Sequence, residues 1–140
     1  MIILDTNVVS EPMRRAPDGT VQNWLNEQVD SALFTTSISV MELRLGVERL
    51  PEGKRKASLW DVLDFTLSRL IGPRILPFDT AAAIECARIA ALAEAGGTPI
   101  GQADGQIAAI ARTHDFAIAT RDTAPFQNAG LTIIDPWASA

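Results

Sequence analysis

The chain has 140 residues, of which 47% are hydrophobic and 6% aromatic, so it can form one domain with an aliphatic core. The formal net charge of −5 argues against nonspecific binding to nucleic acid, because such binding needs a basic surface. No stretch approaches the roughly 20 apolar residues that span a bilayer, and no leader sequence is visible, so we expect a cytoplasmic protein.

The first half of the chain predicts two strands and three helices, from apolar runs and from apolar residues at helical spacing. These are a strand at 1–4, a helix at 20–28, a strand at 32–36 and helices at 39–50 and 54–70. A polar, proline-bearing turn leads from the first strand to the first helix.

The second half continues the alternation of strands and helices. It predicts a strand at 74–78, helices at 80–95 and 102–113, and strands at 117–120 and 131–134. Pro77 indicates that the third strand lies at an edge of the sheet or ends at this residue. Strands separated by helices predict an α/β fold, with a parallel sheet of four or five strands flanked by helices on both faces. The pattern leaves the order of the strands open.

Cys86 and His114 are the single cysteine and the single histidine of the chain. Cys86 cannot form an internal disulfide, and its alanine-rich helical surroundings predict a buried structural thiol. His114 stands at a helix end, where a charge or a surface position is expected. The absence of a histidine or cysteine cluster argues against zinc.

Four acids stand at points that a parallel sheet can bring together. Asp5 ends the first strand, Glu42 follows the second strand, Asp104 lies near the start of a helix, and Asp122 follows the fourth strand. Strand ends and the following helix starts face the carboxyl edge of a parallel sheet, where ligands bind. Asp104 belongs there only if its helix begins at the same edge.

Each acid also has a structural explanation. Asp5 is typical of a turn, and Asp122 of a loop. Glu42 completes a capping box that begins at Ser39. Asp104 is favourable near a helix N-terminus, although it shares a stripe with apolar residues. The joint placement of the four acids, rather than any one of them, predicts a site.

Several carboxylates in one cleft repel one another unless a cation neutralises them. Their hard oxygen atoms suit Mg²⁺ or Mn²⁺, which can activate water and stabilise the leaving oxygen in phosphodiester hydrolysis.

The motifs at these acids resemble those of a known family. They are MIILDTN at 1–7, SISVMEL at 37–43, DGQIAA at 104–109 and TRD at 120–122, followed by GLTIIDPW at 130–137. In this order and spacing they are similar to the PIN-domain ribonucleases, more narrowly to VapC-type toxins of the FitB-like branch. The resemblance spans essentially the whole chain. It departs from the pattern at Pro125, where relatives often carry another acid.

The resemblance implies a single PIN-like domain over 1–140 and an endoribonuclease that depends on Mg²⁺ or Mn²⁺. It places the four acids around the metal, with Asp122 as the more variable member. Thr6, Asn7 and Thr120 would support the site by hydrogen bonding. It further implies a homodimer, and a small antitoxin that blocks the cleft with one end and binds operator DNA with the other.

Within that hypothesis Asp5 and Asp104 are the principal metal ligands. Glu42 completes the site or orients water, and Asp122 holds a second ion or positions the nucleophile. Arg121 is a candidate for phosphate binding, with a salt bridge to a neighbouring acid as the alternative. Arg14 and Arg15 are candidates for guiding RNA.

Two other functions remain open at this point. One is a magnesium-dependent phosphatase with Asp5 as the nucleophile, although the second aspartate expected two residues on is replaced by Asn7. The other is a non-catalytic role as the binding partner in a repressor complex, which gives no reason for a repulsive acidic pocket.

Overall fold

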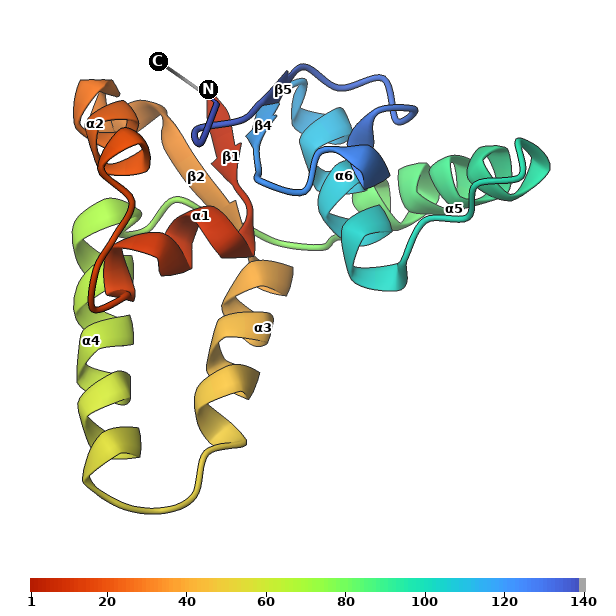
Figure 1. The fold of residues 1–140 in the computed structure, drawn as a ribbon. Helices are drawn as coiled ribbons and strands as arrows, with labels where there is room; N and C mark the ends of the chain where they lie inside the picture. Colours follow the sequence, from red (N-terminus) through yellow and green to blue (C-terminus); the bar gives the residue numbers. More distant parts are fainter. Residues whose placement is uncertain (139–140) are drawn as a thin grey trace.

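The computed structural model describes residues 1–138 as a five-stranded parallel sheet with helices on both faces (Figure 1). The strands are β1 (Ile2–Leu4), β2 (Leu33–Thr36), β3 (Ile75–Leu76), β4 (Ala117–Ala119) and β5 (Ile133–Ile134). The α-helices are α1 (Thr6–Ser10), α2 (Gly19–Glu27), α3 (Ser37–Glu48), α4 (Lys54–Leu70), α5 (Thr80–Ala95) and α6 (Gln102–His114). Short 3-10 helices are η1 (Glu11–Met13), η2 (Asp30–Ala32) and η3 (Ala124–Phe126). Among the helices of this region, none is long and apolar enough to cross a membrane.

The strands lie in the order β3-β2-β1-β4-β5, and every neighbouring pair is parallel. The first strand is therefore the central one, with β2 on one side and β4 on the other. The edge position predicted from Pro77 is confirmed, since that residue directly follows the edge strand β3. The chain winds outward in two directions from β1, so the order reverses between β1 and β4. Open α/β sheets bind ligands at this kind of switch point.

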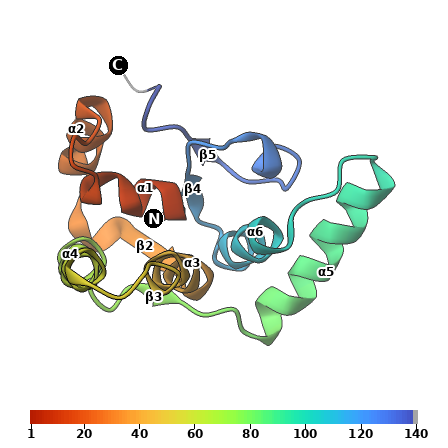
Figure 2. The same cartoon turned by 60° about the horizontal axis from the view of Figure 1, so that its bottom comes forward.

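Successive side chains of the central strands belong to two different hydrophobic cores, one on each face of the sheet. Leu4 packs into a core with residues of α1 to α4, whereas Ile3 packs into the other with α5 and α6. Successive side chains of a strand point to opposite faces, which explains the division. The view in Figure 2 shows α5 and α6 gathered at one side and α2 and α4 at the other. The prediction of helices on both faces is confirmed.

The helix α1 and the turn η1 were not expected from the sequence. They occupy the segment that was expected to be a polar turn, and they begin one residue after β1. Five residues are too few to show a helical period, and Val8 and Val9 are typical of strands. Both valines are fully buried, so tertiary packing rather than local propensity stabilises this helix. Asp5 caps the helix and therefore does more than begin a turn.

Cys86 differs from its prediction in degree. Its thiol is free but only half-buried. On the same helix, Ala82 and Ile89 are buried while Ile84 and Leu92 are exposed, so α5 packs along one face only. Cys86 lies on the flank of that face. His114 is the last residue of its helix, as expected, and its ring lies 5.4 Å from that of Phe116.

We expect Asp115→Gly to stabilise the protein by about 0.5–1 kcal/mol. Asp115 ends α6 in the left-handed conformation, with φ of 55°, which glycine adopts without steric cost. Its negative charge also opposes the dipole at the helix C-terminus. The measurement is urea unfolding at pH 7. Asp115→Ala is the matched control, because it removes the charge and retains Cβ. A glycine variant no more stable than the alanine variant would contradict the conformational part of this account.

Candidate active site

Asp5 and Thr120 are brought together by the switch point of the sheet. Asp5 follows β1 and Thr120 follows β4, and these strands are paired neighbours. The Thr120 hydroxyl donates a hydrogen bond of 2.8 Å to Asp5 Oδ2 across 115 residues of sequence. The same hydroxyl oxygen accepts a hydrogen bond from the backbone N–H of Asp122 at 3.2 Å. Thr120 is fully buried, so it joins the central acid to the loop that carries the exposed Asp122.

Asp5 is a buried carboxylate with both oxygen atoms hydrogen-bonded. Its side chain is 6% exposed, and Oδ1 accepts a bond of 2.8 Å from the backbone N–H of Thr6. Burial raises the pKa of Asp5, and repulsion from Glu42 and Asp122 raises it further. The hydrogen bonds from Thr120 and Thr6 act in the opposite direction. The site therefore holds this carboxylate in a place where its negative charge is costly.

Glu42 lies in the second turn of α3 and does not form the capping box expected from the sequence. The N-cap of α3 is Thr36, whose hydroxyl oxygen accepts a bond from the backbone N–H of Ser39 at 3.1 Å. Because the helix starts earlier than predicted, Glu42 is free to face α1. Its Oε1 accepts a hydrogen bond of 2.7 Å from the Thr6 hydroxyl. The capping explanation of Glu42 is thus wrong.

Ser39 was assigned to the capping box and was not predicted to belong to the site. It is fully buried, and its hydroxyl oxygen lies 3.0 Å from that of Thr6. Thr6 therefore contacts both Ser39 and Glu42 from the first position of α1. A hydroxyl has one proton, and the shorter bond to the charged Glu42 is the stronger of the two. Sequence spacing could not reveal Ser39, since its role depends on how α1 meets α3.

Asp104 is the third residue of α6 and completes the group. This helix begins at the same edge as the ends of β1 and β4, as the prediction required, since Asp104 is close enough to Asp5 and Asp122 to be repelled by them. Partial burial raises the pKa of Asp104, and repulsion from Asp5, Asp122 and Glu42 raises it further. The four predicted acids therefore come from separate segments and repel one another within one region.

The positions of the four acids bear on whether the site could bind a metal ion. Within residues 1–138, no three histidine, cysteine, aspartate or glutamate side chains form a group ready to hold a metal ion. The chemistry of the donors nevertheless fits a hard divalent cation, since carboxylate and hydroxyl oxygen atoms surround a partly buried region of excess negative charge. Mg²⁺ commonly keeps several waters and contacts one or two carboxylates directly. The four acids suit an ion bound in that manner.

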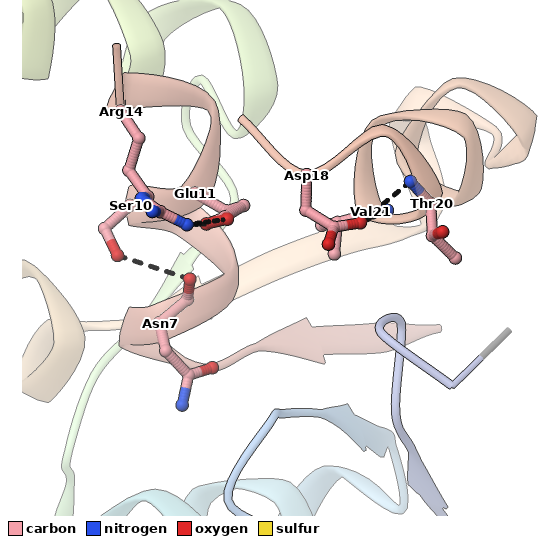
Figure 3. Close-up of polar contacts among 7 residues, drawn as sticks. All are labelled: Asn7, Ser10, Glu11, Arg14, Asp18, Thr20 and Val21. Atoms are coloured by element: carbon pink, nitrogen blue, oxygen red, sulfur yellow. Dashed lines mark hydrogen bonds and ion pairs between the residues drawn. The ribbon is translucent and has the colours of Figure 1, made fainter. Parts of the chain in front are cut away.

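The predicted basic residues differ in their surroundings. Arg14 donates to the buried carboxylate of Glu11 at 2.7 Å, so its charge is already paired (Figure 3). Arg15 is exposed next to it. Asn7, drawn in the same figure at the start of α1, accepts a bond of 3.3 Å from the backbone N–H of Arg121 through Oδ1. Arg121 itself is exposed beside the acids.

The PIN-domain family model matches residues 2–131 of the chain. The chain belongs to the PIN-domain family. It is 44% identical over 140 residues to VapC ribonuclease Y4jK of Sinorhizobium fredii, with all of both proteins covered. It is also 43% identical over 137 residues to toxin FitB of Neisseria gonorrhoeae, covering 98% of this chain and 99% of that protein.

Solved structures agree with this assignment. The chain superimposes on a chain of the crystal structure of FitAcB from Neisseria gonorrhoeae with a TM-score of 0.92 and 43% identity, covering 99% of each. The α/β fold and the resemblance to VapC-type and FitB-like proteins are confirmed.

We expect Asp104→Asn to stabilise the metal-free protein at pH 7 by on the order of 0.5–1 kcal/mol. The raised pKa of Asp104 means that the folded state binds its proton more tightly than the unfolded state. Stability is therefore lost as pH rises through the folded pKa, and the neutral amide avoids that loss. The gain should vanish at acid pH, below the ordinary aspartate value of 3.8.

The measurement is urea unfolding of wild type and variant in EDTA at neutral and acid pH. Asp61→Asn, at an exposed position of α4, is the control for net charge. An equal gain from Asp61→Asn would show that the neighbouring acids are not the cause.

Proposed function

We propose that this protein is an endoribonuclease dependent on Mg²⁺ or Mn²⁺ and the toxin of a type II toxin–antitoxin pair. The observation that carries the proposal is the convergence of Asp5, Glu42, Asp104 and Asp122, from four separate segments, at the switch point of a PIN fold. A bare cluster of this kind lowers stability, and a bound cation would offset the repulsion. Membership in the PIN family and the similarity to a VapC ribonuclease support the same conclusion.

The chain's residues divide into those that hold the cation and those that position them. Asp5 and Asp104 would bind the ion, and Glu42 would complete the site or orient water. Asp122, which is exposed, would hold a second ion or position the nucleophile. Bound Mg²⁺ or Mn²⁺ would supply a water of lowered pKa and offset charge on the cleaved phosphodiester.

Two threonines fix the geometry of these acids. Thr120 holds Oδ2 of Asp5, while the backbone N–H of Thr6 holds Oδ1. The hydroxyl of Thr6 holds Glu42. Carboxylates restrained in this way lose less conformational entropy when a cation and an RNA strand bind.

The RNA would run along a groove of about 450 Å³ beside the acids. Gly101 and Asp122 lie at the end nearest the site, and the lining continues through Pro125 to Asn128. Pro125, where relatives often carry an acid, thus contributes an apolar surface to the groove, leaving Asp122 as the acid of this loop.

The alternative of a phosphatase with Asp5 as the nucleophile has less support. Such enzymes carry a second aspartate two residues on, whereas this chain has Asn7 there, and the chain belongs to the PIN-domain family. A purely non-catalytic role does not explain why four mutually repulsive acids are placed together.

The proposal includes partners and location. A small antitoxin with a DNA-binding domain would cover the cleft, two copies of this chain would form a homodimer, and the pair would act in the cytoplasm. The resemblance to VapC-type and FitB-like toxins supports these assignments.

Asp5→Asn tests the chemistry directly. We expect RNA cleavage in Mg²⁺ or Mn²⁺ to fall by at least about 100-fold, since the amide is a poorer ligand for a hard cation. The fold should persist, because asparagine caps a helix as well as aspartate does. The measurement is the cleavage rate of a labelled RNA, with circular dichroism to verify folding.

Asp61→Asn is the matched control and should cleave RNA at the wild-type rate. EDTA should abolish cleavage by the wild-type protein and by Asp61→Asn. Undiminished cleavage by Asp5→Asn would refute the proposed site. A trapped phospho-aspartate at Asp5 would favour the phosphatase instead.

A further inference from the structure

Arg121 is an exposed arginine at the acidic edge of the sheet. It stands next to Asp122, yet within residues 1–138 it forms no ion pair with an acid. The salt bridge considered from the sequence is therefore absent. Instead, the guanidinium carbon of Arg121 lies 5.1 Å from the centroid of the Trp137 ring. A tryptophan face attracts a cation at this distance.

Stacking on a ring leaves much of the guanidinium group available. Attraction to the ring does not use the hydrogen-bonding capacity of the guanidinium, which has five N–H donors. These donors match two oxygen atoms of a phosphate. The four acids repel the phosphates of an approaching RNA strand. A guanidinium beside the acids would attract a phosphate and offset part of this repulsion.

Trp137 is held in place by the sheet. Ile134 of β5 pairs with Ala119 of β4, and the backbone N–H of Thr120 donates to the Ile134 carbonyl at 2.9 Å. The segments that follow the two strands therefore leave the sheet side by side. Trp137 is half-buried and packs against the core that contains Leu4.

Arg121 is thus restrained at two points. Its backbone N–H donates to Oδ1 of Asn7, and its side chain lies against Trp137. A guanidinium fixed in this way loses less conformational entropy when it binds an anion than a mobile one.

Two other arginines, Arg14 and Arg44, contrast with Arg121 because each is paired with an acid. Arg14 is paired with the buried Glu11. Arg44 also lies over a tryptophan, at 4.5 Å from the Trp60 ring, but its guanidinium is 3.5 Å from a carboxylate oxygen of Asp64. It therefore reproduces the stacking of Arg121 without its free charge.

We infer that Arg121 binds a phosphate of the RNA beside the four acids, and that Trp137 is the positioning residue that holds it there. The inference rests on the proposed ribonuclease function.

The first test is binding of a labelled single-stranded RNA, with Asp104→Asn as the background so that cleavage does not interfere. Arg121→Ala should weaken binding about 5- to 10-fold and reduce the slope of log K against log salt by about 0.7, the value for one lost phosphate contact on a single strand. Arg44→Ala is the matched control and should leave the slope unchanged. An unchanged slope in Arg121→Ala would overturn the assignment.

The second test is a double-mutant cycle of Arg121→Ala and Trp137→Ala, read as RNA affinity. Trp137→Ala should weaken binding several-fold when Arg121 is present and have no further effect when it is absent. Trp137→Phe should restore most of the affinity, because phenylalanine retains an aromatic face. An equal loss from Trp137→Ala in both backgrounds would show a merely structural role and overturn the positioning claim.

Wild-type cleavage separates failure of this inference from failure of the proposed function. If the wild-type protein cleaves RNA in Mn²⁺ and Arg121→Ala retains the full salt slope, only the inference fails. If the wild-type protein neither cleaves nor binds RNA, the proposed function fails and the inference falls with it.

Discussion

The hydrogen bond from the Thr120 hydroxyl to the Asp5 carboxylate is the interaction on which the site depends. It joins the ends of the two strands on either side of the switch point and has no exposure to water at Thr120. Asp5 in turn caps α1, which carries Thr6 to Glu42, and Thr120 accepts from the backbone of Asp122. One contact between two central strands thus sets the positions of three acids. This explains why the site lies on strand ends rather than on long loops, where positions are less exact.

The same arrangement carries an energetic cost that the fold has to meet. Four acids repel one another, and burial of Asp5 adds to the penalty. Two hydrophobic cores, one on each face of the sheet, supply the compensating stability. Proteins commonly retain such unfavourable charge where function requires it. A cation bound at the acids would reduce this penalty from outside the chain.

Much of the fold could be predicted because apolar spacing and helix ends were clear. The helices α4 and α5 have the predicted bounds, with Gly53 before one and Asp79 capping the other. Strand order was not predictable, because pairing between distant strands leaves no local pattern. The four acids were placed correctly at one edge, but the hydrogen bonds of Glu42 were not. A sequence match to a capping box cannot show that the helix begins earlier, at Thr36. The stacking of Arg121 on Trp137 is likewise a contact that only tertiary structure reveals.

The long separation between Asp5 and Thr120 has a consequence for the synthesis of the protein. Residues 5–116 lie between the central strand β1 and its neighbour β4, so β4 is made long after β1. Domains fold largely as units, and distant strand pairing is slow compared with local structure. A nascent chain that ends before β4 holds Asp5 without its hydroxyl partner and without Asp122. The acidic edge is therefore assembled only after β4 has been made, so a shorter nascent chain has no complete site.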